Sequence, residues 1–281
     1  MKVLVTGGAG FVGTNLAMAL RDTGHDVVVI DNYSTGLREN CQEGIQYVEV
    51  DLAECLEFSN WGAFDVVYHL AATARIGPSF EAPAEYFRNN AGGTLNVVDW
   101  CARNVVPLIY SGSSSKWSGK FKNPYTFSKD VGEEVVELYR QHFNLKATIA
   151  RFYNVYGPYQ LLGGDFATLI GRWIYNLREG IECEVFGDGE QRRDFTHVDD
   201  IVEALILIQS TQSWGHDFEL GRGANWSVNE VAQMMGITPV YRPGKKGEAR
   251  NTLNQDDSAQ KILGWKPERN LKDYLDETLS T

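Results

Sequence analysis

Short runs of apolar residues alternate with longer stretches of helical periodicity through the first 160 residues. The runs predict strands and the stretches predict helices. Nearly continuous apolar strands separated by helices indicate a parallel sheet that is covered on both faces. We expect strands at Lys2–Thr6, Asp26–Ile30, Gln46–Glu49, Val66–His69, Leu108–Ser111 and Thr148–Phe152, and helices at Phe11–Asp22, Glu85–Asn104 and Tyr125–Phe143.

The regular alternation ends after Gly157-Pro158. Beyond it the pattern predicts a helix over Phe166–Glu179, a short strand at Val185-Phe186 and a helix over Val198–Gln209, followed by small elements and a helical C-terminal segment. The predicted fold class is α/β, with a doubly wound parallel sheet in residues 1–160. Residues 161–281 are expected to form a smaller substrate-binding lobe, partly interleaved with the sheet.

A glycine-rich turn, Gly7-Gly8-Ala9-Gly10-Phe11-Val12-Gly13, links the first strand to the first helix, and Asp31 ends the second strand. Glycines at this spacing let the backbone approach a pyrophosphate, and the helix N-terminus favours its negative charge. A carboxylate about 20 residues later suits a ribose hydroxyl. A strand–turn–helix without a ligand is the alternative, but the whole βαβ context favours a Rossmann dinucleotide site. Asp31 favours NAD over NADP, because a carboxylate repels a 2′-phosphate.

Composition excludes several classes of function. The net charge of −11 argues against a general nucleic-acid-binding surface. The four cysteines form no C-x-x-C pair and the histidines show no metal-binding spacing, so we expect no metal site. No apolar run approaches the length of a membrane span, and the first strand begins at Lys2, which leaves no room for a cleaved signal peptide. A cytoplasmic location is expected.

Tyr125 and Lys129 are four residues apart on a predicted helix, so they share one face. A nearby cation favours the phenolate and lowers the pKa of the tyrosine, which makes it a usable base near neutral pH. An amphipathic helix with an incidental Tyr and Lys is the alternative. Ser113, Ser114 and Ser115 follow a strand, at the edge where open sheets bind ligands. Serines are also common in turns, but the combination with Tyr125 and Lys129 favours a catalytic site.

This combination resembles the extended short-chain dehydrogenase/reductase family, and most closely its NAD-dependent nucleotide-sugar epimerases. The resemblance runs along almost the whole chain. The matching motifs are Thr6–Gly13, Asp31-Asn32, Asp51-Leu52, His69-Leu70-Ala71-Ala72, Asn90–Thr94, Tyr125 with Lys129, Arg151–Pro158, Gly187–Phe195, Val198-Asp199-Asp200 and Leu263–Pro267.

The resemblance implies a role for each matching residue. Ser113 would bind the sugar 4-oxygen, Tyr125 would be the base, and Lys129 would bind the nicotinamide ribose. NAD would contact Gly7, Gly10, Phe11, Val12, Gly13, Asp31, Asn32, Ser34, Thr35, Gly36, Asp51, Leu52, Leu70, Ala71, Ala72, Asn90, Ser111, Tyr125, Lys129 and Phe152. The nucleotide sugar would contact Ser113, Ser114, Ser115, Asn154, Phe166, Arg193, Lys245, Glu248, Arg250 and Thr252.

Arg193 suits the diphosphate because its guanidinium binds phosphate oxygens bidentately, and Lys245 or Arg250 would add a second contact. Glu248 would bind the nucleotide ribose. Surface ion pairing is the alternative for Arg193 and Glu248. By analogy with the family, we expect a homodimer formed through Glu85–Asn104 and Tyr125–Arg140.

The resemblance favours epimerisation over dehydration. Dehydratases of the family carry an Asp-Glu pair directly after the catalytic Thr or Ser, whereas this chain has Ser114 and Ser115. A hydroxyl does not replace a carboxyl as a general acid or base. We predict inversion of C4 of a UDP-sugar (UDP-glucose and UDP-galactose, or the N-acetyl forms) through a 4-keto intermediate. The alternatives are a UDP-glucuronate 4-epimerase, another nucleotide-sugar oxidoreductase or reductase, and a non-catalytic regulator that binds the same ligands.

Three positions depart from the family pattern. Ser113 and Tyr125 are only 12 residues apart, which is shorter than usual, so we expect a loop over the sugar to be missing and the pocket to be more open. Lys116-Trp117-Ser118 replaces the usual Val-Tyr-Gly, and Gln255 replaces an Asp. Thr252 lies where a bulky aromatic residue excludes N-acetyl sugars, so the small side chain predicts that they are admitted.

Overall fold

The computed structural model describes residues 1–280 and contains a seven-stranded parallel sheet with the strand order β11-β6-β5-β4-β1-β2-β3. The order reverses between β1 and β4, which is the switch point where open α/β sheets bind ligands. The strands are β1 Lys2–Thr6, β2 Asp26–Asp31, β3 Gln46–Glu49, β4 Val66–His69, β5 Leu108–Ser113, β6 Ala147–Phe152 and β11 Asp217–Leu220.

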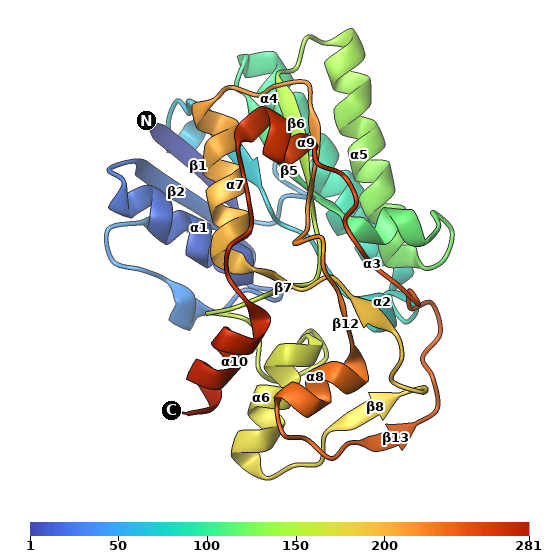
Figure 1. Ribbon diagram of the computed structural model, residues 1–281. Helices are drawn as coiled ribbons and strands as arrows, with labels where there is room; N and C mark the ends of the chain where they lie inside the picture. The colour runs from blue at the N-terminus through green and yellow to red at the C-terminus, as the bar shows by residue number, and fades with distance from the viewer. Residues whose placement is uncertain (281) are drawn as a thin grey trace.

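Helices cover both faces of the sheet, as the apolar strands predict (Figure 1). On one face the core joins the sheet to α1 (Phe11–Asp22), α7 (Val198–Ser210) and α9 (Ser258–Leu263). On the other face it joins the sheet to α4 (Thr94–Asn104) and α5 (Pro124–His142). The predicted doubly wound α/β fold is confirmed.

A smaller lobe lies below the sheet in Figure 1 and has its own apolar core. Its helices are α6 (Leu169–Glu179), α8 (Val228–Met234) and α10 (Leu271–Leu279), and β8 (Glu184–Phe186) pairs there with β13 (Val240–Arg242). Two further pairs are β7 (Val155–Tyr156) with β10 (Thr196–His197), and β9 (Arg192–Arg193) with β12 (Trp226–Ser227). Because β11 lies beyond residue 160 and belongs to the large sheet, the two parts of the chain are interleaved.

The long helix expected over Glu85–Asn104 is divided in the structure. It follows the short α2 (Ile76–Ser79) and runs as α3 (Pro83–Phe87), a π-helical segment η3 (Arg88–Gly93) and α4. Such π turns occur often at functional sites, and Asn89 of η3 reaches the pocket described below. Short 3₁₀ helices complete the fold at η1 (Arg38–Asn40), η2 (Ser59–Trp61) and η4 (Ser114–Ser118).

The helix predicted from Phe166 starts later than expected. Its N-cap is Thr168 and α6 begins at Leu169, so Phe166 stays in the preceding loop. There the Phe166 side chain lines the large pocket. A loop position therefore serves the site, and the helical periodicity of the sequence extended one turn too far.

Within residues 1–280, no helix is long and apolar enough to cross a membrane. The same residues contain no cluster of histidine, cysteine and carboxylate side chains able to hold a metal ion.

Candidate active site

The first candidate site is a pocket at the carboxyl ends of the central strands, beside the glycine-rich turn. Gly7 has φ +72°, and a Cβ on Gly13 would lie 2.1 Å from the carbonyl oxygen of Gly7. A side chain does not fit at either position. Because both residues are glycines, the turn is tight and a ligand can approach its backbone closely. The first N–H groups of α1 have no acceptor within the helix, which favours an anionic group at this point.

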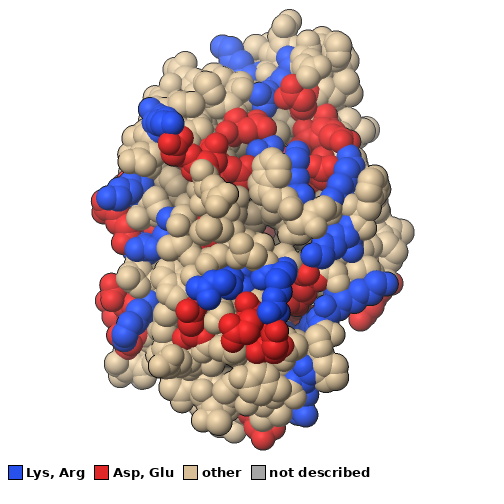
Figure 2. Space-filling view, turned by 45° about the vertical axis from the view of Figure 1, so that its right-hand side comes forward, with Lys and Arg blue, Asp and Glu red and all other residues tan. Residues whose placement is uncertain are grey.

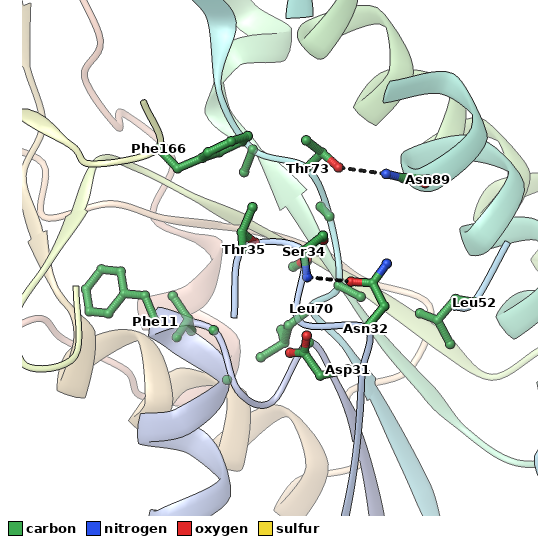
Figure 3. A pocket seen from close by; sticks show the side chains of 18 of the residues that line it. Phe11, Asp31, Asn32, Ser34, Thr35, Leu52, Leu70, Thr73, Asn89 and Phe166 are labelled. Atoms are coloured by element: carbon green, nitrogen blue, oxygen red, sulfur yellow. Dashed lines mark hydrogen bonds between the residues drawn. The ribbon is translucent and has the colours of Figure 1, made fainter. Parts of the chain in front are cut away.

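Asp31 closes one end of the pocket (Figure 3). Its carboxylate accepts hydrogen bonds from the backbone N–H groups of Ala9 at 3.0 Å and Tyr33 at 2.8 Å. Burial raises the pKa of Asp31, and these two backbone contacts oppose the rise. Asn32 accepts a bond from the N–H of Ser34 at 3.0 Å and so shapes the turn after β2. These contacts hold the carboxylate in a fixed position at the pocket wall.

Most of the residues predicted to bind NAD line this one pocket, although they come from distant parts of the chain. Phe11 and Leu52 lie on opposite sides of it in Figure 3. The predicted residues found there are Gly7, Gly10, Phe11, Val12, Gly13, Asp31, Asn32, Ser34, Thr35, Asp51, Leu52, Leu70, Ala71, Ala72, Ser111, Tyr125, Lys129 and Phe152.

Two residues predicted to contact NAD do not line the pocket. Asn90 is buried and holds the loop after β4: its amide oxygen accepts from the N–H of Thr73 at 2.7 Å, and its NH₂ donates to the Thr73 carbonyl and to Ser128. A Cβ on Gly36 would lie 2.9 Å from the Asp31 carboxylate, so this glycine makes room for the acid. Both positions support the pocket from outside it.

Sequence reasoning did not predict several lining residues. Thr73 and Asn89 are joined by a 3.0 Å hydrogen bond at the pocket wall (Figure 3). Thr73 follows β4 at the carboxyl edge of the sheet, which is a usable signal. The others carry no local signal: Ile30, Asn40, Val50, Ala53, Ala74, Gln160, Leu161 and Thr168.

The structure brings the predicted catalytic residues together. The phenol of Tyr125 donates to the Ser113 hydroxyl at 3.3 Å, and Ser113 donates to the Ser115 hydroxyl at 2.9 Å. Lys129 lies one helical turn from Tyr125, with its Nζ 4.3 Å from the ring centroid of Tyr110. Tyr125 and Lys129 line the NAD pocket, so the hydroxyl pair adjoins the predicted cofactor.

The electrostatics of this group differ from the expectation. Burial raises the pKa of Tyr125, and the contact with Ser113 and the charge of Arg75 only oppose that rise. Burial also lowers the pKa of Lys129 to about 8, against the effect of Glu133. The prediction that the neighbouring Lys129 lowers the pKa of Tyr125 is therefore wrong for the protein alone, because burial outweighs the opposing effects of Ser113 and Arg75.

Basic residues gather where the sequence predicted the nucleotide diphosphate. Arg193 lies 3.4 Å from the Glu248 carboxylate, and burial lowers the pKa of both Arg193 and Lys245. The charges of Arg75 and Arg172 also act on Lys245. The face turned forward in Figure 2 shows a band of basic side chains across its middle, with acidic ones beside it.

Arg250 is placed differently from Lys245. Both of its terminal nitrogens bind the Asp188 carboxylate, at 2.7 and 2.8 Å, and its side chain is 64% exposed. The Arg250 guanidinium is therefore already paired at two points within the protein.

The remaining predicted substrate residues lie between the two lobes. Asn154 follows β6 and donates to Thr252 at 3.0 Å. Ser114 and Thr252 both line a second cavity of about 580 Å³, beside the shortened Ser113–Tyr125 segment. Phe166, expected to contact the substrate, lines the same pocket as the residues predicted to bind NAD.

Comparisons with known proteins agree with this geometry. The model of the NAD dependent epimerase/dehydratase family matches residues 3–221. The UDP-glucose 4-epimerase of Corynebacterium glutamicum is 30% identical over 95% of this chain and 91% of its own length. UDP-glucuronic acid decarboxylase 2 of Arabidopsis thaliana is 26% identical over 98% of this chain and 66% of its own length.

A solved structure is similar throughout. The UDP-glucose 4-epimerase of Thermotoga maritima, determined with UDP-glucose, superposes with a TM-score of 0.93 at 30% identity and covers 100% of this chain and 98% of its own. The fold, the glycine turn with Asp31, the Ser113–Tyr125–Lys129 group and the match over residues 3–221 lead to one conclusion: the chain belongs to the NAD-dependent epimerase/dehydratase family.

Proposed function

We propose that the protein inverts C4 of a UDP-linked hexose through a 4-keto intermediate. The contact of Tyr125 with Ser113 beside Lys129, at the wall of the predicted NAD pocket, carries this proposal. The pair offers a hydroxyl donor and a base to a single sugar oxygen. NAD, held by the residues that line the pocket, would supply the acceptor and donor of the C4 hydride.

Each residue of the group has a separate task. Tyr125 takes the proton of the sugar 4-hydroxyl during oxidation and returns it during reduction. Ser113 holds the same oxygen by a hydrogen bond and so sets its distance from Tyr125. Lys129 lines the pocket from the next helical turn, where it is proposed to bind the nicotinamide ribose of the cofactor.

The residues after Ser113 favour epimerisation over elimination or decarboxylation. Ser114 is buried, and Ser115 uses its hydroxyl to accept a bond from Ser113. Neither side chain can act as a carboxyl acid or base. Glu133, a carboxylate one turn beyond Lys129 on α5, is held by Arg151 and Lys116. The two serines therefore support return of the hydride over elimination or decarboxylation.

Arg193 and Lys245 are proposed to bind the diphosphate, and Glu248 the ribose of the nucleotide. Arg193 is mostly buried, whereas the Glu248 carboxylate is 38% exposed. Diphosphate oxygens compensate buried cations, because a charge taken from water requires a partner. The weak 3.4 Å contact between Arg193 and Glu248 leaves both groups free to bind a ligand.

One observation favours UDP-glucuronate as a second candidate substrate. Arg75 donates to the backbone carbonyl of Ala167 at 2.6 Å, and its charge acts on Tyr125. A guanidinium held near the reacting hydroxyl suits a sugar that carries a carboxylate. Arg75→Ala would then lower activity toward UDP-glucuronate more than activity toward UDP-glucose.

The test is to incubate the purified protein with UDP-glucose, UDP-N-acetylglucosamine or UDP-glucuronate without added cofactor, and to follow the sugars by NMR. We expect the 4-epimer to form from at least one sugar, with no accumulated absorbance at 340 nm. Tyr125→Phe should slow the conversion by at least about 10²-fold. Absence of any epimer, or absorbance at 340 nm that grows with turnover, would contradict epimerisation; the second result would indicate a net dehydrogenase.

We also propose that the protein forms a homodimer through α4 and α5. Leu95 on α4 and Leu138 on α5 are 42% and 50% exposed, which supports a partner on these helices. Light scattering should then give twice the 31.5 kDa of the chain, and Leu95→Glu with Leu138→Glu should give the monomer. A monomer at all concentrations would contradict the proposal.

A further inference from the structure

The segment between Ser113 and α5 folds into a single 3₁₀ turn, η4. Ser113 is its N-cap: the Ser113 hydroxyl oxygen accepts from the N–H of Ser115 at 3.2 Å. The hydroxyl that meets Tyr125 therefore also caps this turn. A short 3₁₀ turn has poor hydrogen-bond geometry. Other contacts must hold it in place.

Lys116 attaches η4 to α5. Its ammonium lies 2.8 Å from the Glu133 carboxylate and 3.2 Å from that of Asp130. The two acids are 3% and 6% exposed, whereas the Lys116 side chain is 30% exposed. Charge pairs with a buried member are screened less than surface pairs, so this contact is stronger than an ordinary surface ion pair.

Trp117 attaches the same turn to the sheet. Its indole N–H donates to Glu219 at 3.0 Å, and the guanidinium of Arg151 lies 5.6 Å from its ring centroid. Arg151 also binds Glu133 and Glu219, both at 2.9 Å. The five residues Lys116, Glu133, Arg151, Glu219 and Trp117 thus form one continuous network, which we call the η4 brace. It links η4 to α5, β6 and β11.

The brace borders the second cavity, which Trp117, Arg151 and Glu219 help to line. The carboxylate of Glu219 already accepts bonds from Trp117, Arg151 and Tyr153. Its hydrogen-bonding capacity is used within the protein, which argues against a binding site for an ion here. The cavity has another consequence: it gives η4 room to move if the brace is broken.

The brace also acts on the charge balance around Tyr125. The groups that face Tyr125 are Lys129 and Glu133 on α5, Arg75 after β4, Tyr86 on α3 and Ser113. Glu133 is the anion of this set, and Lys116 offsets it. Without Lys116, more of the negative charge of Glu133 acts on the phenol.

We propose that Lys116 and Trp117 are positioning residues for the reaction, holding η4 so that the Ser113 hydroxyl stays at Tyr125. Both lie in the Lys116-Trp117-Ser118 segment that departs from the family pattern. The brace takes the place of the longer loop that is absent from this chain. This inference rests on the proposed function, because its main readout is turnover.

The experiment compares Trp117→Phe, Lys116→Met and Lys116→Arg with wild type, and uses Lys120→Met as the matched control. Lys120 lies in the same segment. It shares Asp130 with Lys116 and also pairs with Glu134, but its ion pairs do not include Glu133 or Glu219 of the η4 brace. The readouts are kcat and KM for the converted UDP-sugar, NAD content, thermal unfolding, and the pH profile of kcat/KM.

Loss of the brace should reduce kcat by about ten- to a hundredfold, since small displacements of reacting groups have effects of this size. We expect this fall in Trp117→Phe and Lys116→Met, with KM and NAD content unchanged. Lys116→Met should also move the acidic limb of the profile to higher pH. Lys116→Arg should have the kcat and the acidic limb of wild type, because it keeps the positive charge. Lys120→Met should resemble wild type in both.

Equal kcat in wild type, Trp117→Phe and Lys116→Met would overturn the proposal. So would an equal loss in Lys120→Met, or a loss explained by unfolding or by KM alone. A second measurement needs no turnover: absorbance of the Tyr125 phenolate, taken as the difference from Tyr125→Phe, titrates at higher pH in Lys116→Met. If wild type converts no sugar, the proposed function fails while this titration still tests the brace, and an unchanged titration overturns it.

Discussion

The side-chain amide of Asn154 donates a hydrogen bond of 3.0 Å to the hydroxyl of Thr252, 98 positions later in the chain. Thr252 also accepts from the backbone N–H of Asp194 at 3.2 Å. These contacts fix a small side chain between the segment after β6 and the C-terminal part of the chain. The second cavity lies beside it.

This arrangement predicts that residue 252 limits the size of the sugar. Thr252→Tyr fills space near the proposed sugar position, so kcat/KM for UDP-N-acetylglucosamine should fall at least about tenfold. UDP-glucose, which is smaller, should keep its activity within about threefold. Thr252→Val is the control for loss of the hydroxyl alone. A parallel fall for both sugars would contradict a role in selection.

Ser113 and Tyr125 should act as one unit on the sugar oxygen. Tyr125→Phe should reduce kcat by about 10²–10⁴-fold, the usual range for a general base, and Ser113→Ala by about 10²-fold. The double variant should lose little more than Tyr125→Phe, because residues that share one task are not additive. NAD content of each purified variant serves as the control. If the loss of kcat in the double variant equals the product of the two single losses, Ser113 and Tyr125 have independent tasks.

Lys129 should reduce the stability of the protein without ligand below pH 8. Its pKa in the folded state is about 8, lowered by burial from 10.5, so the unfolded chain binds more protons between these values and stability rises with pH there. Relative to Lys129→Met, the wild-type free energy of unfolding should increase by about 1 kcal/mol from pH 7 to pH 9. Urea unfolding of wild type and Lys129→Met at pH 7 and pH 9 measures the free energies. If the two proteins differ in free energy of unfolding by the same amount at both pH values, Lys129 does not titrate in this window.

Asp31 should set the affinity and the choice of cofactor. Asp31→Ala removes the carboxylate that the N–H groups of Ala9 and Tyr33 hold at the pocket. We expect NAD affinity to fall at least about tenfold, as for loss of a hydrogen bond with a charged group, and discrimination against NADP to weaken. Calorimetric titration of cofactor-free protein measures both. Asp26→Asn, an exposed acid at the start of the same strand, should leave them unchanged.

Most of the first six strands could be predicted because they are local apolar runs, although Gln46–Glu49 has polar residues at both ends. The glycine turn could be predicted because the spacing of its glycines follows from the backbone conformation that the turn requires. The seventh strand, β11, was not predicted. In Asp217-Phe218-Glu219-Leu220 two acids alternate with apolar residues, which is unlike the buried strands. It pairs in parallel with β6, where Arg151 also binds both Asp217 and Glu219.

The site residues also fall into those that the local sequence indicates and those that only the tertiary structure reveals. Residues at strand ends, such as Asp31 and Ser113, carry their signal in the local sequence. Thr168 does not, because it reaches the pocket only through tertiary packing of its loop. The raised pKa of Tyr125 was missed for a related reason: spacing shows the cation four residues away, whereas burial depends on the whole fold.

The late position of β11 in the chain has a consequence for biosynthesis. As the chain leaves the ribosome, β6 is made before its neighbour in the sheet, β11. Until then the edge of β6 is unpaired, and Arg151 lacks its partner Asp217, which lies 66 positions later. Residues of the smaller lobe are made in that interval, so the large sheet cannot close before they exist. An unpaired strand edge in a nascent chain promotes aggregation. Acquisition of the native state is thus coupled to near-complete translation, and a nascent chain that ends near residue 160 exposes its sheet edge.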